Sequence, residues 1–185
     1  MQTRSTWKLF ASAGALALFM AGPLVSPGPA SAAGSGGDTQ PTQCEKGYVY
    51  DENTKACVKA GAGLLDDEEM FAQGRDLALA GYYQSALDIL SYVRNQHDDM
   101  VLTYVGYANR KLGKVDEGIA FYHQALAINP NNLNTREYLG EGYVAAGRMD
   151  LAVGELNKLE ALCGTGCDQY EQLELAIART PERWQ

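Results

Sequence analysis

The stretch that decides the fold runs from Leu102 to Pro130 and reads LTYVGYANRKLGKVDEGIAFYHQALAINP. Apolar residues recur at three- and four-residue intervals on both sides of Gly113, which is the pattern of two amphipathic helices. Gly113 supplies the left-handed residue that commonly ends a helix. Pro130 disfavours helical backbone in the residue before it. We therefore expect two short helices joined by a tight turn.

The same pattern recurs before and after this stretch. Four positions agree across three copies, at offsets of 32 and then 34 residues: Gly74, Gly106 and Gly140; Gly81, Gly113 and Gly147; Ala86, Gly118 and Ala152; Leu90, Tyr122 and Leu156. Self-similarity at a fixed period predicts a repeat architecture. Small residues let two helices cross closely, so we expect Gly106 to face Gly118, and Gly140 to face Ala152.

Residues 67–163 resemble three tetratricopeptide repeats, of which 102–130 carries nearly the whole pattern. The copy from Arg136 to Leu162 ends in a cysteine loop, and the copy from Met70 to Val93 has Gln73 where the family usually has Leu. The resemblance implies an all-α fold, an α-solenoid of about three helix-turn-helix repeats. Within a domain at 64–182, we expect repeats at about 67–98, 99–132 and 133–166. An amphipathic capping helix at 168–179 would hide the last apolar face.

The resemblance also implies a function, since such repeats bind a peptide or protein partner in a concave groove lined by the first helix of each pair. Tyr104 and Tyr138 would border this groove. The Lys and Asn residues of the subclass that binds C-terminal carboxylates are absent, so that mode of binding is not expected. The positions that would line the groove are Phe71, Arg75, Thr103, Tyr107, Arg110, Glu137 and Glu141.

The N-terminal segment has the layout of a secretory signal peptide, which we place at 1–33. Arg4 and Lys8 precede an apolar run, and small residues allow cleavage near Ala32 or Ala33. The run is shorter than the ~20 residues that a bilayer span requires, so stable membrane insertion after cleavage is not expected. Residues 34–43 are a flexible linker by composition. We expect an exported protein, in the periplasm if its source is bacterial.

Export makes disulfides the expected state of the four cysteines. Proximity favours Cys44–Cys57 and Cys163–Cys167, although three connectivities remain open. The first pair would staple a small hairpin at 44–60, because two isolated strands are marginal in water. Two alternatives remain: the hairpin contacts a glycan and the protein is an envelope-assembly accessory factor, or Cys163 and Cys167 are redox-active.

The composition disfavours several other classes of function. The net charge is −8, and an acidic chain is repelled by nucleic acid and by anionic lipid. His97 beside two Asp residues is better explained as a polar loop than as a metal or catalytic site. No nucleophile elbow, phosphate-binding loop or zinc-protease motif occurs in the sequence. We expect no enzyme activity, no cofactor and no metal site, and predict a protein-interaction scaffold of the cell envelope.

Overall fold

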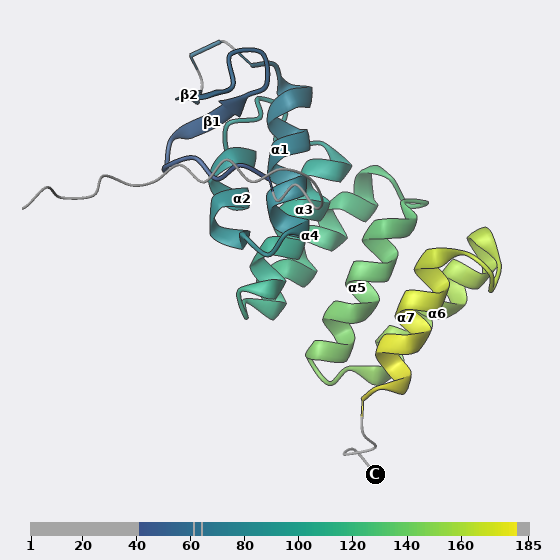
Figure 1. The fold of residues 1–185 in the computed structure, drawn as a ribbon. Helices are drawn as coiled ribbons and strands as arrows, with labels where there is room; N and C mark the ends of the chain where they lie inside the picture. The colour runs from purple at the N-terminus through teal and green to yellow at the C-terminus, as the bar shows by residue number, and fades with distance from the viewer. Residues whose placement is uncertain (1–40, 61, 64, 181–185) are drawn as a thin grey trace, which may run out of the picture. The chain divides into compact units, whose positions relative to one another are not determined.

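The computed structural model describes residues 41–60, 62–63 and 65–180 (Figure 1). The expected signal peptide therefore lies outside the described residues. The described part is mostly helical with one small sheet, which confirms the predicted fold class. Its elements are β1 (Tyr48–Asp51), β2 (Ala56–Lys59), α1 (Asp67–Leu79), α2 (Tyr83–Leu90), α3 (Asp99–Lys111), α4 (Val115–Ile128), α5 (Leu133–Ala145), α6 (Met149–Cys163) and α7 (Asp168–Ala178).

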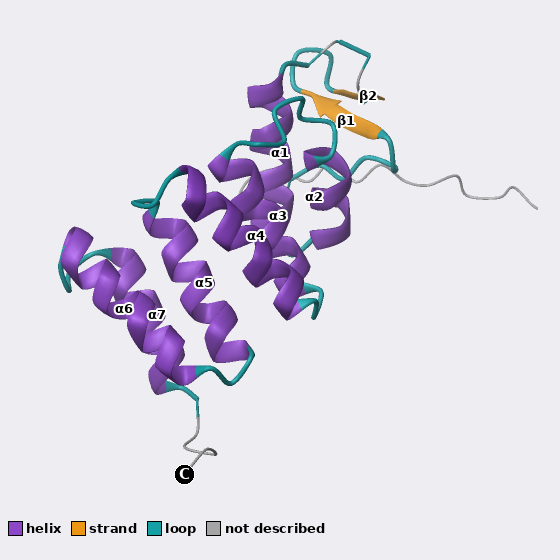
Figure 2. Cartoon of the chain, turned by 180° about the vertical axis from the view of Figure 1, so that it is seen from behind, coloured by secondary structure: helices purple, strands orange, loops and turns teal. Residues whose placement is uncertain are grey.

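Consecutive helices pack against each other, and the first helices of neighbouring pairs also meet. α1 contacts α3, α3 contacts α5, and α5 contacts α7. Figure 2 shows α5, α6 and α7 side by side at the C-terminal end of the stack. The first helices thus form one layer, and side chains from three of them can share a surface. Among the helices described, none has the length and hydropathy needed to cross a bilayer.

The first helix of each pair begins at an Asp or Asn that caps it. Asp66 accepts a hydrogen bond from the Glu69 backbone N–H at 2.9 Å. Asp98 caps α3 and Asn132 caps α5 in the same way. A side-chain oxygen here satisfies a helix N–H that has no partner inside the helix. These caps are spaced by the same 32 and 34 residues as the glycines, so they are a further repeated position that the sequence analysis missed.

Close crossing within the pairs depends on the repeated glycines. A Cβ on Gly106 would lie 2.8 Å from Cε1 of Tyr122 and 3.0 Å from the backbone oxygen of Gly118. Gly106 and Gly118 therefore face each other as expected. The third copy differs, because the atoms nearest to a Cβ on Gly140 all belong to Leu173 of α7, not to Ala152. Gly140 thus makes room for the last helix of the stack.

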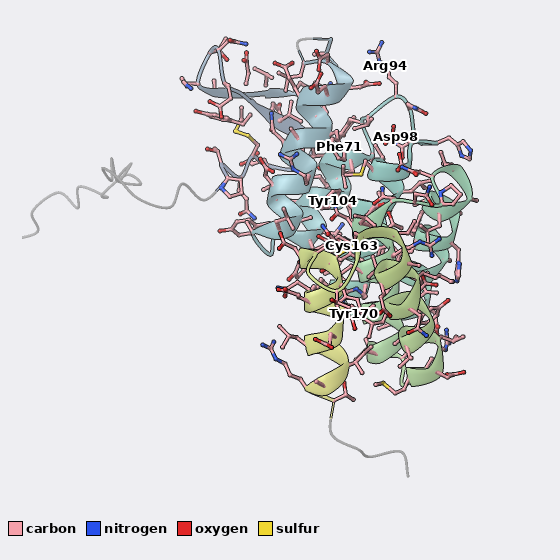
Figure 3. The ribbon with its side chains drawn as sticks, turned by 90° about the vertical axis from the view of Figure 1, so that its right-hand side faces the viewer. Phe71, Arg94, Asp98, Tyr104, Cys163 and Tyr170 are labelled. Carbon is pink, nitrogen blue, oxygen red and sulfur yellow. A yellow bond between two sulfur atoms is a disulfide. The ribbon has the colours of Figure 1, made fainter. Side chains whose placement is uncertain are left out.

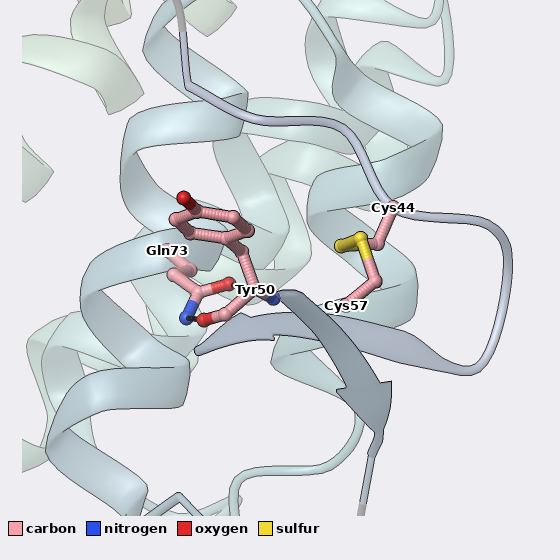
Figure 4. Close-up of a disulfide and its surroundings, with 4 residues drawn as sticks. All are labelled: Cys44, Tyr50, Cys57 and Gln73. Atoms are coloured by element: carbon pink, nitrogen blue, oxygen red, sulfur yellow. Dashed lines mark hydrogen bonds between the residues drawn. A yellow bond between two sulfur atoms is a disulfide. The ribbon is translucent and has the colours of Figure 1, made fainter. Parts of the chain in front are cut away.

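The hairpin packs on the first helix pair. β1 and β2 are antiparallel with Val49 opposite Val58, and Val49 is fully buried in the core formed with Met70 and Leu90. The Tyr50 N–H donates to Oε1 of Gln73 at 2.9 Å, and Nε2 of Gln73 donates back to the Tyr50 oxygen (Figure 4). The hairpin therefore covers the apolar end of the stack, and Gln73 departs from the repeat pattern because it holds β1.

Two further contacts close the two ends of the stack. At the hairpin, the Gly47 N–H donates to Oδ2 of Asp88 on α2 at 2.9 Å. At the C-terminal end, Leu173 of α7 is completely buried.

The cysteines form the local pairs Cys44–Cys57 and Cys163–Cys167, which resolves the connectivity that the sequence left open. The second disulfide joins the end of α6 to the start of α7.

Candidate functional site

Aromatic side chains from three first helices and from α2 meet in one cluster. The aromatic cluster consists of Phe71 on α1, Tyr83 on α2, Tyr104 and Tyr107 on α3, and Tyr138 on α5. Figure 3 shows Phe71 and Tyr104 near each other, with ring centroids 5.9 Å apart. The rings of Tyr107 and Tyr138 are closer, at 4.9 Å. Edge-to-face and tilted contacts of this kind stabilise a cluster beyond the area that it buries.

The cluster is partly open to solvent. Tyr104 is buried, whereas Phe71, Tyr107 and Tyr138 are half-buried. Burial raises the pKa of Tyr104, of Tyr107 and, more strongly, of Tyr138. Their hydroxyl groups are protonated at neutral pH, as tyrosine hydroxyls ordinarily are, and can donate as well as accept hydrogen bonds. The cluster therefore combines apolar aromatic rings with tyrosine hydroxyl groups that can form hydrogen bonds.

Cations flank the aromatic cluster. The Arg75 guanidinium carbon lies 6.0 Å from the centre of the Phe71 ring. The Lys111 ammonium nitrogen lies 5.3 Å from the centre of the Tyr107 ring, and Lys111 is exposed. These are cation–π distances. The repeat pattern gives no signal for Lys111, because this residue directly follows Arg110 and matches no groove position.

Thr103 and Arg110 lie inside the stack, which corrects the expectation that they line an open groove. Thr103 is fully buried, and its Oγ1 lies 2.6 Å from Oγ1 of Thr135 on α5. Arg110 is also buried; it donates to Glu141 on α5 and, at 3.2 Å, to the Tyr122 hydroxyl. Buried polar groups require such partners. Both residues therefore join α3 to α5 and are not available to a ligand.

Glu137 and Glu141 lie one turn apart on α5, and their environments differ. Glu141 is engaged by Arg110. Burial raises the pKa of Glu137 to about 7, and the negative charge of Glu141 adds to this effect. Glu137 is therefore only partly ionised at neutral pH. The structure thus places less negative charge at this end of the surface than two free Glu residues would carry.

His97 lies in the loop between α2 and α3, as the sequence indicated. It is exposed, and its backbone N–H donates to Asn95. Over residues 41–60, 62–63 and 65–180, no three His, Cys, Asp or Glu side chains come together in a way that could hold a metal ion. The polar-loop interpretation accounts for every contact of His97 that the structure shows.

Comparison with solved structures finds a neighbour that is similar in both sequence and fold. The structure described as MamA AMB-1 C2221 is 29% identical over 60% of this chain and 67% of its own, with a TM-score of 0.50. No family model and no curated protein matches this chain. MamA contains tetratricopeptide repeats. The likeness supports a repeat fold of this type and, in general, a protein-interaction scaffold.

Proposed function

We propose that this protein is a non-enzymatic scaffold that binds a segment of a protein partner across the aromatic cluster of α1, α2, α3 and α5. The observation that carries the proposal is the cluster itself, since five aromatic rings from four helices are held together at a partly open surface. Tyrosine dominates binding energy at many protein interfaces. Its ring gives large contact area with only two side-chain torsions to order.

The flanking charges add specificity to this surface. Lys111 places positive charge beside the Tyr107 ring, whereas Arg75, beside Phe71, forms an ion pair with Asp76. Glu137 lies at the α5 end with a carboxyl group that gains or loses a proton near neutral pH. Electrostatic complementarity at such positions selects partners and speeds association. A partner segment with an acidic residue opposite Lys111 fits this arrangement.

We place the protein in the periplasm, after export directed by a signal peptide at 1–33. The flexible linker at 34–43 would then precede the hairpin in the mature chain. The two disulfides support an oxidising compartment. Sequencing the N-terminus of the protein recovered from the periplasmic fraction tests this placement, with a new terminus after Ala32 or Ala33 as the expected result. Recovery from the cytosol with residue 1 intact would contradict it.

A charge reversal at the edge of the cluster tests the binding surface. In Lys111→Glu, we expect partner recovery by affinity capture from the native compartment to fall about tenfold, which corresponds to ~1.4 kcal/mol. Lys59→Glu makes the same change at an exposed residue of β2 and serves as the matched control. Equal recovery with both variants, each folded by circular dichroism, would contradict the proposed surface.

A further inference from the structure

A cavity lies between the hairpin and the first helix pair. Its volume is about 250 Å³, and none of the residues that line it belongs to the aromatic cluster. Tyr48, Tyr50, Leu77 and Ile89 supply its apolar walls. Tyr48 is 42% exposed, so its ring is accessible from solvent. The cavity is therefore a separate place where this chain can bind a small group.

Polar groups of α2 border the cavity, and several are free to bind a ligand. Gln84, Ser85 and Asp88 line it from one helix. In the described part of the chain, neither the Gln84 amide nor the Ser85 hydroxyl has a hydrogen-bond partner. Asp88 uses Oδ2 to accept the Gly47 N–H, and its other carboxylate oxygen makes no such bond to a described residue. An amide, a hydroxyl and a carboxylate oxygen thus converge on one small space.

The backbone of β1 is not free to bind an extended peptide at this cavity. A peptide that adds to a sheet edge needs unpaired strand N–H and C=O groups. Gln73 occupies both such groups of Tyr50, and the Gly47 N–H is taken by Asp88. The Tyr48 N–H is bonded to the Glu45 oxygen. We therefore base recognition on the side chains that line the cavity: the rings of Tyr48 and Tyr50, and the amide, hydroxyl and carboxylate of Gln84, Ser85 and Asp88.

We propose that this cavity binds a single sugar ring. A pyranose has an apolar C–H face that packs on a tyrosine ring, and its hydroxyl groups both donate and accept hydrogen bonds. Asp88 accepts from such hydroxyls, whereas the Gln84 amide and the Ser85 hydroxyl can do both. The volume lies below the range of drug-sized pockets, about 300–1,000 Å³, so one ring is enclosed and neighbouring rings extend into solvent past Tyr48.

Titration of the purified full chain with soluble sugars tests this proposal. The probes are glucose, N-acetylglucosamine and their β-1,4-linked disaccharides, followed by two-dimensional amide NMR. We expect at least one probe to bind saturably in the millimolar range and to shift the amide signals of Gln84, Ser85 and Asp88. Loss of one hydrogen bond in Ser85→Ala or Gln84→Ala is expected to weaken binding about tenfold. Gln124→Ala, at an exposed Gln of α4, is expected to bind as the parent does.

Three results would overturn the sugar site. They are the absence of saturable binding to all four probes, shifts that lie away from α2 and the hairpin, and equal affinity in Ser85→Ala, Gln84→Ala and Gln124→Ala. A short tyrosine-containing peptide is titrated in parallel, and if it alone produces the shifts at α2, the cavity binds protein and the proposal fails. Lys111→Glu is expected to leave sugar binding unchanged, so failure here is distinct from failure of the aromatic cluster as a partner surface.

Discussion

At the scale of single residues, Gly106 shows why the helix crossing requires a glycine. A methyl group there would come within 2.8 Å of the Tyr122 ring and 3.0 Å of the Gly118 oxygen. Both neighbours are buried, and one is backbone, so neither can move away at low cost. The repeated glycines in the sequence predicted that α3 and α4 cross closely at Gly106 and Gly118, because only small residues permit such a crossing. The same repeat could not predict that Gly140 faces α7.

We predict that Gly106→Ala lowers the free energy of unfolding by about 1–3 kcal/mol, as overpacking does in other cores. The matched control is Gly154→Ala on α6, where no atom of another element lies within 4 Å of the new Cβ. That variant is expected to be neutral or to stabilise the chain by up to ~1 kcal/mol, because Ala favours helix over Gly. Urea unfolding followed by circular dichroism measures both, and equal stability of the two variants would contradict the close crossing.

Glu137 makes the stability of the protein depend on pH. Its pKa is about 7 in the folded chain against a usual value of 4.5. A carboxyl group with a raised folded pKa binds its proton more tightly in the folded state, so folding is favoured below pH ~4.5, and this contribution is lost as the pH rises to ~7. Glu137→Gln is therefore predicted to stabilise the chain at pH 8 by about 1–2 kcal/mol, a figure reduced for solvent screening.

The same variant should flatten the stability profile between pH 4.5 and 7. Thermal unfolding at several pH values measures this effect. Glu160→Gln removes a carboxylate from an exposed position of α6 and is the control. A profile of Glu137→Gln that parallels both the parent and Glu160→Gln would show that Glu137 is not held in an unfavourable environment.

At the scale of elements, the hairpin of β1 and β2 shows best what the sequence can and cannot predict. Sequence reasoning could predict two strands, because Tyr48, Val49 and Tyr50 favour strand and a turn follows them. It could not predict where the hairpin packs, since that depends on Gln73 more than twenty residues away. Gln73 was noted as a departure from the repeat pattern. Only the structure shows that its amide satisfies both backbone groups of Tyr50.

Restoring the usual residue of the repeat should loosen the hairpin. In Gln73→Leu, we predict that hydrogen exchange of the Tyr50 amide accelerates about tenfold or more, because both backbone groups of Tyr50 lose their partner. The helices should keep their protection. Gln124→Leu, at an exposed residue with no described partner, is the control. Unchanged exchange at Tyr50 in Gln73→Leu would show that Val49 and the disulfide hold the hairpin without it.

At the scale of the whole molecule, the stack of helix pairs can be predicted from sequence, whereas the exposure of individual side chains on its surface cannot. Helix pairs follow from local apolar spacing and from turn residues such as Gly113, which has a φ of 86°. Exposure depends on how closely one pair approaches the next. Thr103 and Arg110 match groove positions of the repeat pattern, yet the approach of α5 to α3 buries both and pairs them with Thr135 and Glu141. The surface that we propose for the partner is consequently more aromatic and less charged than the pattern suggested.

We propose that the partner binds the aromatic cluster and not the outer face of the second helices. Site-specific photo-crosslinking in the native compartment tests it most directly, with the crosslinker at Arg75 or Lys111 beside the cluster and at Gln124 or Leu151 on α4 and α6, the last two exposed. We predict a protein adduct of the same mass from Arg75 and Lys111 and none from Gln124 or Leu151. Adducts from Gln124 and Leu151 alone would show that the partner binds the second helices and not the aromatic cluster.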